Sequence, residues 1–398
     1  MRILIVHNRY QQPGGEDCVV KSEADLLRGH LHHVAYYEAD NHGIEGPLDN
    51  IKTAVRCAWS PQAQRSFCRT LDDVNPDVVH VHNFFPLISP AVHHAAHRRG
   101  IPVIQTLHNY RLLCPAATML RNGSICEACT REWYPLSAVR HACYHQSHAA
   151  TIAVANMVVL HRAIGTWTKT VNAFIALSEF ARRKFVSSGF PEDRIFVKPN
   201  FLADDPGIGQ GTGDYVLFVG RLSDEKGIAC LLQAWKAVRS KFRLIIVGDG
   251  PLAPMVRESS GTDPTVQWLG YLDRSRILAL MGSAFAFVFP SVWFEAFPLV
   301  LAEALAKGLP VIASNLGSMA EIIAHRRTGL LFPPGSPLDL ANTLQWAFDH
   351  RPEVVAMRKP ARVEFESKYT AENNYRMLMN IYRAALPDVA ARPMATAV

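Results

Sequence analysis

The chain of 398 residues lacks an uninterrupted apolar run long enough to cross a bilayer. Its longest apolar stretch, residues 284–306, is broken by Pro290, Glu295, Pro298 and Glu303, so it predicts a strand, a loop and a helix. The N-terminal MRILIV has no charged region, apolar region and cleavage site of the kind found in signal peptides. We therefore expect a cytoplasmic protein whose eight cysteines are reduced or metal-bound rather than paired in disulfides.

Features of nucleic-acid binding are also missing. The formal net charge is only +6, and no dense run of Lys and Arg is interleaved with aromatic residues, so nucleic acid is not an expected partner. The first 200 residues carry 21 Lys and Arg against 16 Asp and Glu. This excess fits a modestly basic solvated face, or a peripheral contact with the anionic inner face of a membrane.

Two common phosphate-binding patterns are absent from the sequence. There is no G-x-G-x-x-G, so a nicotinamide cofactor is not indicated, and no Asp-x-Asp in a plausible metal-nucleotide setting. The stretch QQPGGEDCVV instead places Gly14 and Gly15 between a predicted strand and a predicted helix. Glycines there allow the backbone to approach a phosphate or a sugar closely, although a plain strand-to-helix turn explains them equally well.

Short apolar runs alternate with amphipathic stretches in both halves of the chain. This alternation predicts α/β architecture with two Rossmann-like, doubly wound parallel sheets, and so two domains facing across a cleft. A Gly-, Asp- and Pro-rich stretch at residues 204–214 is the best candidate for the linker. The predicted strands are residues 3–6, 77–82 and 102–107 in the first domain (1–203), and 215–220, 243–248, 284–289 and 310–314 in the second (204–368).

The segment SVWFEAFPLVLAEALAKGLPVIAS contains two carboxylates, Glu295 and Glu303, eight residues apart. Pro298 suits the first turn of a helix, and the free N–H groups of that turn form an anion site. A carboxylate accepts hydrogen bonds from two neighbouring hydroxyls, as on a ribose or a hexose. The segment therefore predicts contacts with a nucleotide sugar, the alternative being an exposed helix face. The nucleotide-binding candidates here are Phe297, Pro298, Leu299, Val300 and Glu303.

The stretch GRLSDEKGI follows the predicted strand at residues 215–220. It places Arg221 and Lys226 in a loop at the carboxyl end of that strand, where two cations would neutralise a diphosphate leaving group. A solvated basic loop is the alternative. His108 likewise follows the strand at residues 102–107, so we expect it to project into the cleft, or else to pack as a structural histidine.

Together these motifs resemble the retaining glycosyltransferases of family 4, which have the GT-B fold. The resemblance rests on the E-x7-E segment, GRLSDEKGI and IIVGDGP in the second half, and on MRILIVHN, PDVVHVHN and IPVIQTLHNYRLLCP in the first. It implies that a final helix, residues 369–386, crosses back onto the first domain. Beyond that helix we expect a disordered tail, residues 387–398.

The resemblance also implies a function. The donor would be a UDP- or GDP-sugar, with Arg221 and Lys226 on the diphosphate, Glu303 on the ribose, and Glu295 and His108 on the sugar. Transfer would be metal-independent and retain the anomeric configuration, with the leaving phosphate taking the acceptor's proton. The acceptor would be a glycan or a polyprenyl- or other lipid-linked glycan, as in bacterial surface-polysaccharide synthesis. A GT-B nucleotide-sugar epimerase or hydrolase, or a non-catalytic zinc-containing scaffold, are the alternatives.

Four of the cysteines lie within thirty residues. Cys114, Cys126, Cys129 and Cys143 form the pattern C-x11-C-x2-C-x13-C in what reads as an insertion. Four such thiols suit a tetrahedral structural zinc site that rigidifies a loop beside His108, although one close pair is weaker evidence than two. Four buried free thiols are the alternative. A redox C-x-x-C is disfavoured because no thioredoxin-like strand and helix surround it.

Overall fold

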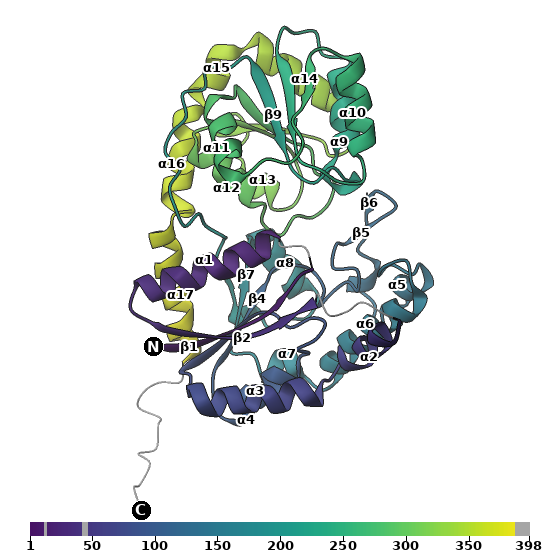
Figure 1. Cartoon of the computed structure of the whole chain (residues 1–398), viewed down its shortest axis with the longest axis vertical. Coiled ribbons are helices and arrows are strands. Elements are labelled where there is room, and N and C mark those ends of the chain that lie inside the picture. The colour runs from purple at the N-terminus through teal and green to yellow at the C-terminus, as the bar shows by residue number, and fades with distance from the viewer. Residues whose placement is uncertain (12–13, 42–46, 387–398) are drawn as a thin grey trace, which may run out of the picture.

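The computed structural model describes residues 1–11, 14–41 and 47–386, with the side chains of residues 47–51 excepted. It shows two α/β lobes stacked along the long axis (Figure 1). The predicted disordered tail, residues 387–398, lies outside the described residues. No helix among the described residues is long and apolar enough to span a bilayer.

The first lobe is built on a six-stranded parallel sheet in the order β2-β1-β3-β4-β7-β8. Its central strands are buried on both faces, which explains their continuous apolar runs. The strands are β1 (Arg2–Arg9), β2 (His33–Asp40), β3 (Val78–Asn83), β4 (Val103–Leu107), β7 (Ala173–Ala176) and β8 (Ile195–Val197). The helices are α1 (Gly15–Gly29), α2 (Pro47–Arg56), α3 (Pro61–Val74), α4 (Ala91–Arg98), α6 (His148–Ala163), α7 (Thr166–Lys169) and α8 (Glu179–Ser187).

The second lobe repeats this architecture with the order β11-β10-β9-β12-β13-β14, again parallel. Its strands are β9 (Tyr215–Val219), β10 (Arg243–Val247), β11 (Val266–Trp268), β12 (Ala286–Phe289), β13 (Val311–Ser314) and β14 (Gly329–Phe332). Its helices are α9 (Ile228–Trp235), α10 (Ala253–Thr262), α11 (Arg274–Ser283), α12 (Leu299–Ala306), α13 (Met319–Ile322), α14 (Pro337–Asp349), α15 (Arg351–Ala356) and α16 (Arg358–Lys368).

Each sheet has a point where the strand order reverses. In the first lobe it lies between β1 and β3, and in the second between β9 and β12. Ligands of doubly wound sheets bind at the carboxyl ends of the strands beside such a point. The loops after β1, β4, β9 and β12 carry the residues that the sequence singled out, so the topology gathers them at these two points.

The predicted linker is a strap that packs against the second lobe. The N–H groups of Gly209, Gly211 and Gly213 donate to the carbonyls of Lys307, Gly282 and Ser283. A Cβ on Gly209 would lie 2.3 Å from the Gly282 carbonyl oxygen, so only glycine fits there. The low apolar content of this stretch therefore reflects backbone packing.

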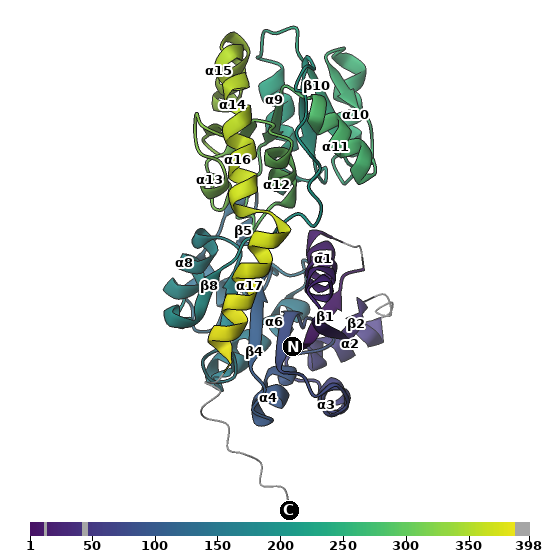
Figure 2. The same ribbon diagram turned by 90° about the vertical axis from the view of Figure 1, so that its left-hand side faces the viewer.

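The helix α17 (Ala371–Ala385) follows α16 and runs down onto the first lobe (Figure 2). Leu378 and Tyr382 are fully buried and share a core cluster with Ile3 and Ile5 of β1. A bridge between Leu202 and Thr370 marks where the outgoing and returning chains pass each other. The first lobe's core is therefore completed by the last helix of the chain.

The apolar runs of the sequence predict the central strands but not several others. Of these, β2 is an edge strand of partial burial, and β7, β8, β11 and β14 are only three or four residues long. The helix α9, which follows the loop containing Arg221 and Lys226, ends at Trp235. Residues 239–241 are exposed or half-buried and lead into β10.

Candidate functional site

Two loops of the second lobe meet around an ion pair. The Nζ of Lys226, after β9, lies 2.6 Å from the Oε1 of Glu295, after β12. Glu295 is only 6% exposed, and the Ser291 hydroxyl also donates to its Oε1 at 3.0 Å. The rings of Phe289 and Trp293 flank the ammonium at 5.7 and 5.4 Å. The structure thus joins the predicted diphosphate-binding lysine directly to the first glutamate of E-x7-E.

The backbones of the same two loops are in contact. The carbonyl of Glu225 accepts a hydrogen bond from the Val292 N–H at 2.9 Å. It also lies 3.0 Å from the Ser291 hydroxyl, whose one proton is shared between this carbonyl and Glu295 Oε1. Gly227 has φ +71°, and a Cβ there would lie 2.0 Å from the Pro290 carbonyl oxygen. A side chain at this position would push the loops apart and with them Lys226 and Glu295.

Arg221 and Glu303 lie on either side of this ion pair in the sequence. Arg221 is exposed, and its side chain contacts no charged partner in the described parts of the chain. Glu303 lies in the second turn of α12, where its Oε1 accepts a hydrogen bond from Arg274 Nε at 2.8 Å. A ribose that binds Glu303 must therefore share it with Arg274 or replace that contact.

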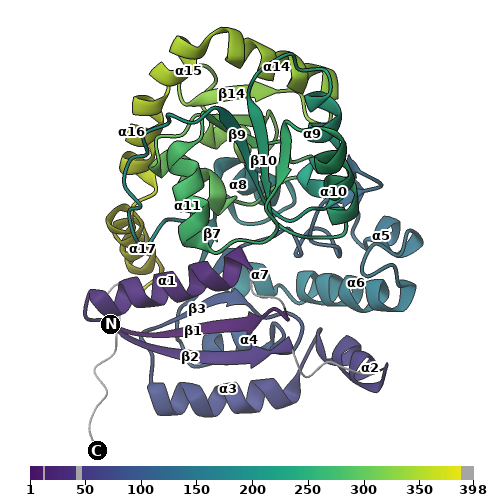
Figure 3. The same cartoon turned by 45° about the horizontal axis from the view of Figure 1, so that its top comes forward.

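The start of α12 faces the first lobe. Pro298 is the N-cap residue, so the free N–H groups begin at Leu299 and Val300, while the Phe297 ring packs edge-on against Tyr369. A Cβ built on Gly15, at the start of α1, would lie 3.7 Å from a methyl carbon of Leu299. Gly15 and α12 are therefore close across the lobes, and Figure 3 shows α1 lying between β1 and the second lobe.

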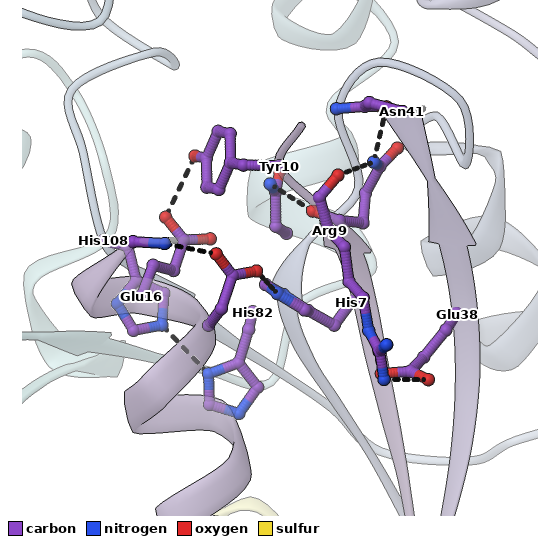
Figure 4. Close-up of polar contacts among 12 residues, drawn as sticks. His7, Arg9, Tyr10, Glu16, Glu38, Asn41, His82 and His108 are labelled. Atoms are coloured by element: carbon purple, nitrogen blue, oxygen red, sulfur yellow. Dashed lines mark hydrogen bonds and ion pairs between the residues drawn. The ribbon is translucent and has the colours of Figure 1, made fainter. Parts of the chain in front are cut away.

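The loop at Gly14 is held by polar contacts that the sequence analysis did not foresee. Asp17 accepts hydrogen bonds from the Gly14 N–H and, at 2.8 Å, contacts His7 Nε2. Tyr10 donates its hydroxyl to Glu16 at 3.0 Å (Figure 4). Burial raises the pKa of Glu16 to about 8, so this carboxyl is largely protonated at neutral pH.

His108 lies immediately after β4, as its position in the sequence predicts. Its Nε2 is 2.9 Å from Nδ1 of His82 on the neighbouring strand β3 (Figure 4). Burial, followed by the proximity of His82, lowers the pKa of His108 well below its usual value, so the ring is neutral. A neutral imidazole at this strand end is suited to hydrogen bonding rather than to charge stabilisation.

Family models match both lobes. A Glycosyltransferase Family 4 model matches residues 26–205, and a Glycosyl transferases group 1 model matches residues 213–350. The chain belongs to the family 4 glycosyltransferases.

Relatives of known name agree with this assignment. A phosphatidyl-myo-inositol mannosyltransferase of Mycobacterium leprae is 30% identical over 50% of this chain and 55% of its own. The D-rhamnosyltransferase WbpZ of Pseudomonas aeruginosa is 32% identical over 39% of this chain and 42% of its own. The chain thus spans about half the length of these relatives.

Solved structures show the same fold at low sequence identity. Anabaena Alr3699/HepE, in complex with UDP and glucose, has a TM-score of 0.68 and 18% identity, covering 96% of this chain and 100% of its own. Sucrose-phosphate synthase from Thermosynechococcus elongatus has a TM-score of 0.70 and 18% identity, covering 96% and 98%. The predicted GT-B architecture is therefore confirmed.

The cysteine pattern of this family 4 chain lies in an extension of the first lobe. It contains the antiparallel pair β5 (Leu120–Arg121) and β6 (Ser124–Ile125), the 3-10 turn η2 (Ala128–Thr130) and α5 (Leu136–Arg140). Burial and the nearby thiols of Cys114 and Cys126 raise the pKa of Cys129 to about 12. No three of the four sulfurs in this described segment come within 4.8 Å of one another. The thiols are grouped, at separations wider than those in a closed metal site.

The close approach at Gly227 yields a prediction about stability. Gly227→Ala places a side chain at a left-handed φ and against the Pro290 carbonyl, so we expect it to lower the free energy of unfolding by about 1–3 kcal/mol. Urea unfolding followed by circular dichroism measures this change. The matched control is Gly261→Ala in α10, where no atom would meet the added Cβ and helix propensity favours alanine. Equal stability of the two variants would contradict the argument.

Proposed function

We propose that this protein is a retaining glycosyltransferase, moving a sugar from a nucleoside diphosphate to a glycan or lipid-linked acceptor. The observation that carries the proposal is the Lys226–Glu295 ion pair at the second lobe's switch point, with the exposed Arg221 in the same loop as Lys226. The named relatives transfer mannose and rhamnose, and the HepE structures hold UDP. A UDP-sugar is therefore the first donor to test, followed by a GDP-sugar.

In this proposal the second lobe binds the nucleotide. Arg221 and Lys226 contact the diphosphate, and the free N–H groups at the start of α12 supply further donors to it. Glu303 accepts the ribose hydroxyls in exchange for its contact with Arg274. The two cations provide the positive charge that a metal ion supplies in other nucleotide sites, so the transfer needs no added metal.

The chemical step is a front-face displacement. The bond between the anomeric carbon and the β-phosphate oxygen breaks while the acceptor hydroxyl bonds to the same face of that carbon. The hydroxyl proton passes to the leaving phosphate oxygen, and Arg221 and Lys226 stabilise the charge that grows there. Glu295 holds Lys226 in place and orients the sugar together with His108. No protein nucleophile takes part in this account.

The first lobe presents the acceptor in the proposal. His108 and the backbone at Gly14 and Gly15 face the second lobe across the space where donor and acceptor meet. The lipid-linked acceptor, the peripheral membrane contact and the role in surface-polysaccharide synthesis stay predictions from the sequence.

The stereochemistry of the product tests this function. Incubation of the purified protein with UDP- and GDP-sugars and glycan or polyprenyl-linked acceptors should give a product with the donor's anomeric configuration by NMR. The rate should be unchanged by added magnesium. An inverted product would overturn the mechanism. Release of free sugar without transfer would indicate a hydrolase. Formation of an epimerised nucleotide sugar would indicate an epimerase. A protein that binds no nucleotide sugar would be a scaffold.

Substitution of Glu303 and substitution of the two cations, Arg221 and Lys226, should affect different steps, nucleotide binding and turnover. Contacts with the ribose are alike in the ground and transition states, whereas the leaving-group charge develops between them. We therefore expect Glu303→Gln to weaken nucleotide binding about tenfold, and Arg221→Met or Lys226→Met chiefly to lower kcat, on the order of 100-fold.

Initial rates and calorimetric titration of UDP or GDP measure the two effects. Lys241→Met, an exposed lysine of the same lobe, is the matched control and should behave as the wild type. Wild-type turnover in the Arg221→Met/Lys226→Met double variant would remove both residues from the site.

We further propose that Cys114, Cys126, Cys129 and Cys143 hold a structural zinc ion. Ala117, Met119, Asn122 and Ala142 around them have positive φ, a strained backbone that persists only where its surroundings enforce it. A metal bonded to four thiolates would do so and would offset their mutual repulsion. The ion would draw the sulfurs together from their present separations, because zinc–sulfur bonds are about 2.3 Å.

Elemental analysis tests the zinc proposal directly. Protein purified without chelator should contain about one zinc per chain, and Cys126→Ser and Cys129→Ser should lose both the metal and thermal stability. Cys230→Ser in the second lobe is the control and should retain it. Metal-free wild-type protein would refute the proposal and leave four free thiols.

A further inference from the structure

A buried network of charged and aromatic side chains leads from α17 to His108. At its centre is Glu23 of α1, which is 1% exposed and accepts a hydrogen bond from Lys198 Nζ at 2.8 Å through Oε2. The other oxygen, Oε1, lies 3.2 Å from His80 Nδ1 and 3.2 Å from His82 Nε2. His82 in turn contacts His108. One oxygen of the Glu23 carboxylate therefore faces Lys198, and the other faces His80 and His82.

Glu23 is ionised in this network. Burial alone would raise its pKa, but the positive charge of Lys198 and the contacts with His80 hold it well below the usual value. His82 is neutral, because burial and the proximity of His80 lower its pKa to about 3. The network therefore combines one buried carboxylate and one buried ammonium with the neutral imidazoles of His82 and His108.

Three residues of this network are of types that bind metal ions. Glu23, His80 and His82 form the group of possible metal ligands that is closest together in the described part of the chain. The ammonium of Lys198 already compensates the carboxylate's charge, and Asn374 of α17 fixes that ammonium at 3.2 Å. A cation here would have to stand beside the ammonium or displace it. The group is therefore better described as a closed ion pair with two histidines.

The carboxylate dictates the direction of the hydrogen bonds. An ionised carboxylate only accepts, and His82 Nε2 lies 3.2 Å from Glu23 Oε1. Neither atom makes a hydrogen bond to any described residue, so an unprotonated Nε2 would set two lone pairs against each other in a buried site. The proton of His82 therefore resides on Nε2, facing Glu23, which leaves its Nδ1 as an acceptor. His108 Nε2, 2.9 Å from that acceptor, must then carry the proton of the His108 ring.

We infer that Glu23, Lys198 and His82 are positioning residues that hold His108 in its Nε2–H tautomer, so that its Nδ1 presents an acceptor. That nitrogen has no partner in the part of the chain that the structure describes and is not enclosed by protein. The group that it binds is a hydrogen-bond donor, such as a hydroxyl. Its identification as a hydroxyl of the donor sugar rests on the proposed function.

The isosteric variant Glu23→Gln should reverse the direction of the hydrogen bonds that run from residue 23 through His82 to His108. Lys198 only donates, so the amide oxygen will face it and the amide NH2 will face His80 and His82. His82 then accepts at Nε2 and carries its proton on Nδ1. His108 Nε2 becomes the acceptor, and the His108 proton moves to Nδ1, towards the cleft. The site would then offer a donor where it now offers an acceptor.

NMR of protein labelled with 15N in the histidine rings tests this inference without any substrate. Long-range proton–nitrogen correlations distinguish the two neutral tautomers from the imidazolium, and His108→Gln assigns the signals. The wild type should show His108 as Nε2–H at neutral pH, and Glu23→Gln should convert it to Nδ1–H. Glu38→Gln, which replaces a carboxylate paired with Arg9 in the same lobe, is the control and should leave the tautomer unchanged.

Several outcomes would overturn the inference. A wild-type His108 that is Nδ1–H or doubly protonated would do so even if Glu23→Gln fails to fold. An unchanged tautomer in folded Glu23→Gln would show that Glu23 does not set it. If the wild type contains a metal that Glu23→Gln loses and Cys126→Ser retains, then Glu23, His80 and His82 form a metal site and the inference is wrong. Absence of glycosyl transfer would affect the proposed function only.

Discussion

The buried ion pair between Glu23 and Lys198 constrains much of the first lobe. Removing a carboxylate and an ammonium from water costs several kcal/mol per ion, which only close and well-directed partners offset. Those partners come from β3, from the chain after β8 and from α17, while Glu23 itself belongs to α1. Losing one partner would cost about 3–5 kcal/mol, because the other charge would remain buried. The pair therefore fixes the mutual position of elements far apart in the sequence.

The second lobe also contains an ion pair, Lys226–Glu295, which is less buried than Glu23–Lys198. Lys226 and Glu295 must lie near the lobe surface to meet a ligand, so their position depends on the backbone beneath them. The contacts of Glu225 and Gly227 with the loop after β12 give that support. The first lobe thus positions His108 through buried side chains, and the second positions its ion pair through a close approach of two loops.

The positions of three motifs at strand ends could be predicted from local order. E-x7-E, the loop containing Arg221 and Lys226, and His108 follow β12, β9 and β4, as their apolar runs predict, and their roles stay predictions. The pairing of Glu23 and Lys198 could not be predicted, since 175 residues separate them and each alone resembles a solvated surface charge. One signal was present: His80 and His82 alternate within a strand predicted to be buried, where polar side chains need partners. The packing of residues 204–214 against the second lobe could not be predicted, because glycine marks both flexible linkers and close packing.

The return of α17 to the first lobe bears on how the protein is made. Emerging domains generally fold as units, the N-terminal one first, at a synthesis rate of 5–20 residues per second. Here the first lobe lacks Leu378 and Tyr382 until about 180 residues after β8 have been synthesised, roughly 10 to 40 s at that rate. During this interval Ile3 and Ile5 lack part of their apolar packing, and Lys198 and His80 lack their hydrogen bonds to Asn374 and Tyr382. The first lobe is therefore synthesised first, but its core can be completed only after α17 has been made.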